Sequence, residues 1–134
     1  MPQRNSTTDE QGRYPCPCCG YLVFTEEPGS YDICPICFWE DDLFQLRFAD
    51  TAGGANAVSL LDGQRTYATI GACEARLIAH VRQPTAVDQR DTGWRPLDPA
   101  RDKIEDVRTV TNAAQTYPED PTTLYYWRDT YWRR

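Results

Sequence analysis

The sequence predicts a small α+β domain in which a β-hairpin, held by two pairs of cysteines, packs against two or three helices and under an aromatic C-terminal segment. The length of 134 residues allows one domain of ordinary size, about 100–150 residues, and not two large cores. Leu, Ile, Val and Phe are sparse, whereas four Trp and eight Tyr supply large amphipathic rings, so the core is thin. A thin core needs cross-links, and six cysteines can supply them as disulfides or as metal ligands.

The composition divides the chain into three segments. Residues 1–12 are polar and predict a disordered leader, residues 13–98 contain the cysteines and the first expected helices, and residues 99–134 form a partly helical C-terminal extension. No apolar run is long enough for a secretory signal or a membrane-spanning helix. We therefore expect a cytoplasmic protein without membrane contact, in a compartment that keeps thiols reduced.

The predicted strands lie between the two cysteine pairs. Residues 21–24 (YLVF) and 31–33 (YDI) are rich in β-branched and aromatic side chains. Pro28 and Gly29, which lie between these runs, form a turn signal. Together they predict a hairpin whose strands connect the cysteine pairs.

Two helices are predicted after the hairpin. Ser59 followed by Asp62 resembles a capping box, and Gly71 is a C-terminal stop signal, so the first helix is expected between them. The second is expected over residues 72–83, because apolar residues recur there at helical spacing before Pro84.

The C-terminal extension is predicted to contain one more helix and then an aromatic segment. Ile104, Val107 and Val110 line one side of a helix expected within residues 99–114. Residues 124–134 (LYYWRDTYWRR) are too aromatic for an unattached tail, so we expect this segment to lie over the domain.

The cysteines have the spacing of a four-thiolate metal site. Cys16 and Cys19 form one C-x2-C pair, and after fourteen residues Cys34 and Cys37 form a second. In each turn two sulfurs can reach one ion, and two such turns complete a tetrahedron. Zinc is the expected metal, with iron as the alternative. Because four protein ligands leave no open position for water or substrate, the site predicts a structural role, and we expect no enzymatic activity.

The remaining cysteines and the histidine are predicted to lie outside this site. Cys18 lies inside the first turn, but binding through Cys16 and Cys18 would lose the geometry of the C-x2-C loop. Cys73 and His80 are seven residues apart, about 10.5 Å along a helix, and so cannot share an ion. We expect Cys18 to be a non-ligand thiol, Cys73 a core residue, and His80 a surface or capping residue.

The cysteine turns and their neighbours resemble a known family. Residues 14–21 (YPCPCCGY) and 31–42 (YDICPICFWEDD) together resemble the bacterial cysteine-rich CPCC family. Weaker matches follow at residues 53–56 (GGAN), 58–60 (VSL), 71–74 (GACE), 80–82 (HVR) and 90–98 (RDTGWRPLD). The resemblance implies kinship with bacterial proteins and implies no particular activity.

The cysteine turns are also similar to those of rubredoxin-type domains, which hold iron in four thiolates. Those domains follow the first pair with Gly-Tyr, as Gly20 and Tyr21 do here. They usually carry Gly where this chain has Phe38, so we expect the second turn to be less regular than the first. The similarity keeps iron electron transfer, or redox chemistry at Cys18, as an alternative function.

The charge of the chain favours a protein partner over nucleic acid. A formal net charge of −6 and a pI of about 4.7 disfavour binding to phosphates, which Lys and Arg neutralise. An acidic surface suits a basic partner, although such a charge is also ordinary for a soluble small domain. We expect an accessory protein that binds another protein, and a toxin-neutralising immunity role is one form of this. The candidate partner surface consists of Phe38, Trp39, Glu40, Asp41 and Asp42.

A second function class is a zinc ribbon that binds nucleic acid. Basic residues would contact phosphates and tryptophans would stack on bases. The candidates are Arg47, Arg65, Trp127, Arg128, Trp132 and Arg133.

Overall fold

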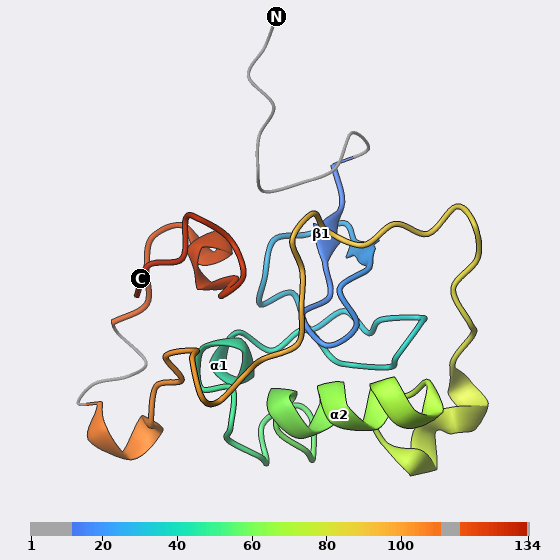
Figure 1. Ribbon diagram of the computed structural model, residues 1–134, viewed down its shortest axis with the longest axis horizontal. Helices are drawn as coiled ribbons and strands as arrows, with labels where there is room; N and C mark the ends of the chain where they lie inside the picture. The colour runs from blue at the N-terminus through green and yellow to red at the C-terminus, as the bar shows by residue number, and fades with distance from the viewer. Residues whose placement is uncertain (1–11, 111–115, 134) are drawn as a thin grey trace, which may run out of the picture.

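The cysteine turns lie among two short strands and a set of short helices (Figure 1). The computed structural model describes residues 12–110 and 116–133. Within them a two-stranded antiparallel sheet and helices accompany the cysteine cluster, which confirms the predicted small α+β fold. The elements are β1 (Tyr14–Pro15), β2 (Leu22–Phe24), α1 (Leu43–Arg47), α2 (Leu60–Ile70), and the 3₁₀ helices η1 (Ala75–His80), η2 (Val107–Thr109) and η4 (Pro121–Leu124).

The hairpin encloses the first cysteine pair and does not connect the two pairs as predicted. β1 pairs antiparallel with β2 across the first turn. Residues 31–33 instead pair with the chain that follows the second turn, through a bridge between Ile33 and Glu40. The reason is local, because each C-x2-C turn reverses the chain and brings its own flanking residues side by side.

Helix α2 forms where it is predicted and packs on the cysteine turns. Ser59 Oγ accepts a hydrogen bond from the Asp62 N–H at 3.1 Å, and Gly71 ends the helix in the left-handed conformation at φ 81°. A β-carbon on Gly63 would lie 3.3 Å from Cys18 Sγ. This close approach explains a glycine inside a helix, where it costs about 1 kcal/mol relative to alanine.

The helix predicted over residues 72–83 is shortened to η1. Near its two ends, backbone groups bond to the second cysteine turn. The Cys73 N–H donates to the Cys37 carbonyl at 2.8 Å, and the Arg82 N–H donates to the Pro35 carbonyl at 3.1 Å. The bond from Arg82 uses a donor that a continuous α-helix would need, and the bond from Cys73 ties the start of the segment to the cysteine turn, which is why the prediction was too long.

Helix α1 is missing from the predicted elements because the acidic residues before it suggest a solvated surface. Asp42 is in fact the N-cap of α1, since its carboxylate accepts from the N–H groups of Phe44 at 2.8 Å and Gln45 at 3.4 Å. The same carboxylate accepts from the Ala55 N–H at 2.8 Å. The Gln45 amide then binds the loop after α1, donating to the carbonyls of Thr51, Asn56 and Val58.

Of the helix predicted within residues 99–114, the described residues form only the short helix η2. Residues 111–115 lie outside the described residues. Asp102 provides the reason. Its carboxylate binds the Arg95 guanidinium at 2.7 and 2.8 Å and accepts from the Asp98 N–H at 2.7 Å. A turn closed by these bonds stands where the helix would begin.

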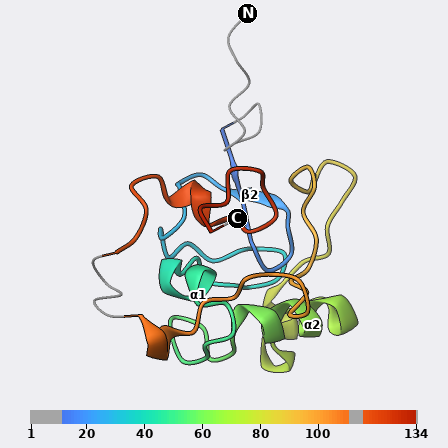
Figure 2. The same cartoon turned by 60° about the vertical axis from the view of Figure 1, so that its left-hand side comes forward.

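The aromatic C-terminal segment lies over the domain, as predicted (Figure 2). Leu124, Tyr125 and Tyr126 are buried in the same hydrophobic core as the cysteines. The core therefore contains residues of both predicted segments, 13–98 and 99–134.

A buried arginine of α1 anchors this C-terminal segment. The Arg47 guanidinium pairs with the Glu105 carboxylate at 3.1 and 3.2 Å and lies 4.9 Å from the ring centre of Tyr117 and 5.0 Å from that of Trp132. An ion pair and aromatic rings thus connect α1 to the end of the chain.

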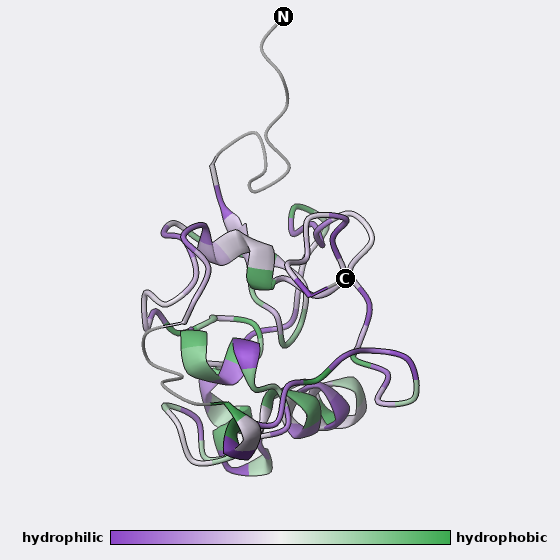
Figure 3. Ribbon diagram, turned by 90° about the vertical axis from the view of Figure 1, so that its left-hand side faces the viewer, coloured by the Kyte–Doolittle hydropathy of each residue, from purple (hydrophilic) through white to green (hydrophobic). Residues whose placement is uncertain are grey.

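The helices are short and contain both apolar and polar residues. Figure 3 shows hydrophobic and hydrophilic residues alternating around their turns. None of the helices in residues 12–110 and 116–133 has the length and apolar character that crossing a bilayer requires. The predicted leader lies outside the described residues, apart from Gly12.

Candidate metal centre

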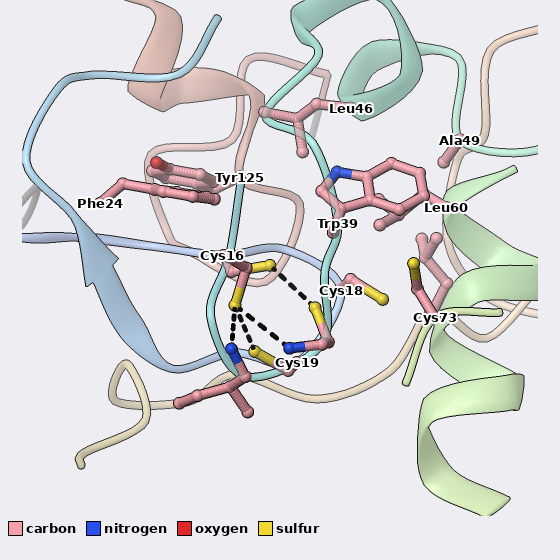
Figure 4. Packing of buried hydrophobic residues seen from close by; sticks show 14 of the residues in the cluster. Cys16, Cys18, Cys19, Phe24, Trp39, Leu46, Ala49, Leu60, Cys73 and Tyr125 are labelled. Carbon is pink, nitrogen blue, oxygen red and sulfur yellow. Dashed lines mark hydrogen bonds between the residues drawn. The ribbon is translucent and has the colours of Figure 1, made fainter. Parts of the chain in front are cut away.

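The four predicted ligands meet in the core. The Sγ atoms of Cys16, Cys19, Cys34 and Cys37 all lie within 4.8 Å of one another, and all four residues are fully buried. Figure 4 shows the side chain of Cys18 turned away from this cluster. The fold thus brings together two turns that are fourteen residues apart in the sequence.

The distances between the sulfurs fit a tetrahedral metal site. Cys16 Sγ lies 3.6 Å from Cys37 Sγ, and Cys19 Sγ lies 3.7 Å from Cys34 Sγ. Four sulfurs about 2.3 Å from a central ion define a tetrahedron with edges of about 3.8 Å. A disulfide would require about 2.05 Å, so these thiols are free to act as ligands. The cluster can therefore hold one metal ion.

The two cysteine turns have the same backbone geometry. The Gly20 N–H donates to the Cys16 carbonyl at 2.7 Å, and the Phe38 N–H donates to the Cys34 carbonyl at 2.9 Å. The φ angles are 85° at Gly20 and 72° at Phe38. The expectation that Phe38 makes the second turn less regular is therefore wrong, because Phe38 adopts the left-handed conformation that glycine usually occupies.

Burial and neighbouring groups set the protonation of the four thiols. Burial raises the pKa of Cys16, Cys19 and Cys37. Burial acts in the same direction on Cys34, but hydrogen bonds from the other thiols and from the Cys37 N–H outweigh it and lower the pKa of Cys34. Since thiolates bind metal and thiols do not, loading the site must release protons.

Residues outside the cysteine turns cap the carbonyls of the first turn. Arg90 Nε donates to the Cys19 carbonyl at 2.9 Å. Trp94 Nε1 and Gln64 Nε2 both donate to the Pro17 carbonyl, at 3.1 and 2.9 Å. The turn is thus held from α2 and from the chain after η1.

Arg90 and Trp94 also cover the outer side of this turn. The Arg90 guanidinium lies 4.7 Å from the ring centre of Tyr21 and 5.0 Å from that of Trp94. The indole of Trp94 occupies the space where a β-carbon on Gly20 would stand. The Arg90 cation therefore lies beside a metal site in which the negative charge of four thiolates would exceed the positive charge of a divalent ion.

The other predicted non-ligands lie outside the four-sulfur group. Cys18 and Cys73 are fully buried, and burial raises the pKa of the Cys73 thiol. His80 is exposed, and its ring centre lies 5.4 Å from that of Phe38. The imidazole is thus a surface group beside the second turn.

The five residues predicted as a partner surface do not form one exposed surface. Trp39, Asp41 and Asp42 are buried. The indole packs against α2, and the two carboxylates accept hydrogen bonds from neighbouring backbone and side-chain groups. These internal roles correct the prediction for the three residues. Phe38 and Glu40 are partly exposed, and their contact with a partner stays a prediction.

Several residues that were candidates for nucleic-acid binding make internal contacts instead. Arg47 is buried with its acidic partner. Arg128 Nε and Trp127 Nε1 both donate to Asp91 Oδ2, at 2.9 and 2.7 Å. Of these candidates Arg65 is exposed on α2, and Arg133 is exposed with its guanidinium 3.3 Å from Glu105 Oε1. The packed C-terminal segment therefore does not present these side chains as a basic groove.

The residues that support the first turn were missed by sequence reasoning. Gln64, Arg90 and Trp94 lie far from Cys16 in the sequence, and no spacing rule connects them to it. Gln64 left a signal, because a polar residue on the buried side of α2 needs hydrogen-bond partners there. Arg90 and Trp94 lie in the weak family match at residues 90–98, which did not indicate their role.

Comparison with known proteins confirms the sequence resemblance over residues 14–88, and the weak match at residues 90–98 lies beyond this range. A search of curated proteins gives no match. The family model for cysteine-rich CPCC proteins matches residues 14–88, from β1 through both cysteine pairs, α2 and η1. This range is more than half of the chain, and it ends before Arg90 and Trp94. The chain belongs to the cysteine-rich CPCC family.

Proposed function

We propose that this chain is a non-enzymatic zinc protein in which one structural Zn²⁺ ion is bound by Cys16, Cys19, Cys34 and Cys37. The observation that carries the proposal is the closed cluster of four fully buried sulfurs, all within 4.8 Å of one another, with two pairs at the tetrahedral separations of 3.6 and 3.7 Å. Four protein ligands complete the coordination of zinc, so no position remains at which water or substrate could be activated. Zinc in such a site contributes directly to folding.

Zinc is preferred to iron because of how the site is enclosed. Tetrahedral four-thiolate sites suit both metals. An iron centre that exchanges electrons benefits from ligands near the surface, whereas here the ligands are fully buried and Trp94 covers the first turn. Enclosure of this kind supports a structural ion. The six free cysteines suit a reducing compartment such as the cytoplasm.

The metal is identified by elemental analysis and visible absorption of the purified protein. We expect a colourless protein with about one zinc per chain. A red protein with iron and charge-transfer bands would replace zinc by iron and favour the electron-transfer alternative.

We propose further that the protein acts as an accessory protein that binds another, basic protein, and toxin neutralisation is one form that such binding takes. The net charge of −6 and the partly exposed Phe38 and Glu40 support this proposal. The internal pairing of Arg47 and Arg128 disfavours the nucleic-acid alternative.

A pull-down with the zinc-loaded protein tests the partner class. We expect it to recover a basic protein whose retention falls as salt is raised, because exposed charges are screened. Binding to single-stranded oligonucleotides should be no tighter than about 10⁻⁴ M at physiological salt. Micromolar oligonucleotide binding, lost on truncation at Pro121, would favour the nucleic-acid alternative.

A further inference from the structure

The excess negative charge of the chain is confined to the cysteine module, defined here as residues 14–46. This module contains six carboxylates and no Lys, Arg or His, whereas acidic and basic residues balance in the rest of the chain. The whole formal net charge of −6 therefore comes from the module, before any thiolate is counted. A field of this sign attracts cationic partners and repels anionic ones.

Four of these carboxylates lie on or near the surface. Glu26, Glu27 and Asp32 are exposed, and Glu40 is partly exposed. Within the described ranges none of the four forms an ion pair with a cationic side chain. Elsewhere the structure pairs many of its acids with arginine, so this arrangement sets the module apart.

The backbone beside the second cysteine turn has an open edge at Ile33. The Asp41 N–H donates to the Asp32 carbonyl and the Cys34 N–H donates to the Trp39 carbonyl, both at 2.9 Å. In this pattern the N–H and carbonyl of Ile33 point away from Glu40, toward the outer edge. No hydrogen bond to either group of Ile33 is found within residues 12–110 and 116–133.

The first cysteine turn has no such edge. Pro15 occupies the position that corresponds to Ile33, because each precedes the first cysteine of its pair, and proline has no N–H to offer. Across the strand, the Leu22 N–H is already paired with the Gln89 carbonyl at 2.9 Å. Glu40, which corresponds to Leu22, is likewise paired, since its N–H and carbonyl bind the Asn56 side-chain amide.

Apolar and aromatic side chains surround the open edge. Ile33 is 46% exposed, Tyr31 is 59% exposed, and Pro35 is also exposed. Tyr31 and Phe38 are the two non-glycine residues with positive φ in the described chain, at 63° and 72°. The geometry of the cysteine turn accounts for this conformation at Phe38, whereas at Tyr31 it costs about 1–3 kcal/mol.

We propose that this surface, formed by Tyr31, Asp32, Ile33, Pro35, Phe38 and Glu40, binds an extended basic peptide segment of another protein. The peptide adds a strand at Ile33, exchanging hydrogen bonds with its free N–H and carbonyl. Its apolar side chains pack on Ile33 and the neighbouring rings. Its Lys or Arg side chains, which alternate to the opposite face, pair with Asp32. Glu40 lies directly across the strand from Ile33 and shares its face, where it adds to the negative charge that attracts the peptide. This inference rests on the proposed protein-binding function and names the surface and the partner chemistry.

The test uses the zinc-loaded full chain and a short synthetic peptide of alternating Lys and Val, followed by backbone amide NMR. We expect a saturable shift of the Ile33 amide, which reports a new hydrogen bond at this position. A peptide with Glu in place of Lys should not bind, because its charge matches that of the module. A Lys-Val peptide with N-methylated valines should bind about fivefold more weakly or worse, because it cannot complete the strand pairing.

Matched variants assign the charge effect to this surface. The double variant Asp32→Asn, Glu40→Gln should weaken the Lys-Val peptide about fivefold or more. The control Asp50→Asn, Asp62→Asn removes the same charge from other exposed positions and should leave binding unchanged within about twofold. The proposal would be overturned if the NMR signal of the Ile33 amide does not shift when the Lys-Val peptide is added. It would also be overturned if the Glu peptide binds equally well, or if the two double variants weaken binding equally.

This result and that of the pull-down are separable, because the peptide assay needs only purified protein. A partner that is recovered in the pull-down but retained equally by the Asp32→Asn, Glu40→Gln variant would overturn this surface and leave the proposed function standing. If the peptide binds at Ile33 but the pull-down recovers no basic partner, the result would support this peptide-binding surface and contradict the proposed protein-binding function.

Discussion

The indole of Trp94 lies over Gly20 and occupies the space that a β-carbon on Gly20 would need. Trp94 also donates to the Pro17 carbonyl, so one side chain holds the first cysteine turn at two points. This contact joins the cysteine turn to a segment beyond the residues that match the family model.

Replacing Gly20 with alanine should destabilise the zinc-loaded protein by about 2–4 kcal/mol. The added methyl group meets the indole, and φ 85° is unfavourable for alanine. Gly53→Ala is the matched control, because Gly53 has φ 83° and open space around it, so only the cost of about 1–2 kcal/mol for the conformation applies. Chemical denaturation of both variants measures the difference, and equal destabilisation would contradict the contact.

Combining Gly20→Ala with Trp94→Ala should be less destabilising than the sum of the two single changes. Trp94→Ala removes the obstacle to the new methyl group, so the two changes share one contact and are not additive. Transfer of zinc to a chelating dye gives a second readout, and it should be faster in Trp94→Ala than in the parent. Strict additivity in the denaturation experiment would contradict the packing described here.

Phe38→Gly should be more stable than Phe38→Ala by about 1 kcal/mol. Both changes remove the ring that lies beside His80, but only glycine adopts φ 72° without steric cost. The comparison therefore isolates the backbone at the second turn. Denaturant midpoints of the two variants measure it, and an alanine variant as stable as the glycine variant would contradict a left-handed residue at this position.

The cysteine site could be predicted from the sequence because C-x2-C spacing is a local property, and α2 because Ser59 and Gly71 are local signals. The pairing of the strands could not be predicted. Residues 31–33 are equally suited to pair with residues 21–24 or with the chain after the second cysteine turn, and the turn geometry decides between these two partners. The extent of η1 depends on bonds to the second cysteine turn, which sequence periodicity does not reveal.

The predicted acidic surface failed in part for a related physical reason. Asp42 is a strong N-cap residue, and the helix that it starts is too short to give a clear periodic pattern. The capping role therefore became visible only with the backbone in place. Glu40, by contrast, is partly exposed, as expected for an unpaired carboxylate.

Arg47→Met should destabilise the protein by about 3–5 kcal/mol, because it leaves the nearly buried Glu105 without its closest cation. Arg108→Met is the control, since the Arg108 to Asp106 pair is largely exposed and should contribute about 1 kcal/mol or less. Thermal or chemical denaturation compares the two. If the two variants lose similar stability, Arg47 does not anchor the C-terminal segment.

Asp41→Asn should stabilise the protein near neutral pH. Burial raises the pKa of Asp41 from its ordinary 3.8 to about 6, although the Ser30 hydroxyl and N–H donate to its carboxylate. A raised carboxyl pKa means that the folded state binds the proton more tightly, so stability falls as the pH rises from about 4 to 6 and stays lower above that. Removing the charge should therefore add about 2–3 kcal/mol at pH 7.

The pH dependence provides the check for this variant. The advantage of Asp41→Asn over the parent should shrink as the pH falls from 6 to 4, because the parent carboxyl is then protonated as well. Denaturation at several pH values measures the difference between the two proteins. A variant that is less stable than the parent at pH 7 would show that the ionised carboxylate is favoured in the fold.

The central claim, that four thiolates bind a single structural zinc ion, is tested most directly by native mass spectrometry of single cysteine variants. The parent, Cys18→Ser and Cys73→Ala should each carry one zinc, whereas Cys16→Ser, Cys19→Ser, Cys34→Ser and Cys37→Ser should each lose the metal and the folded charge-state distribution. Loss of zinc from Cys18→Ser together with its retention in Cys19→Ser would contradict the ligand set, and a metal-free parent that stays folded would contradict the structural role of the ion.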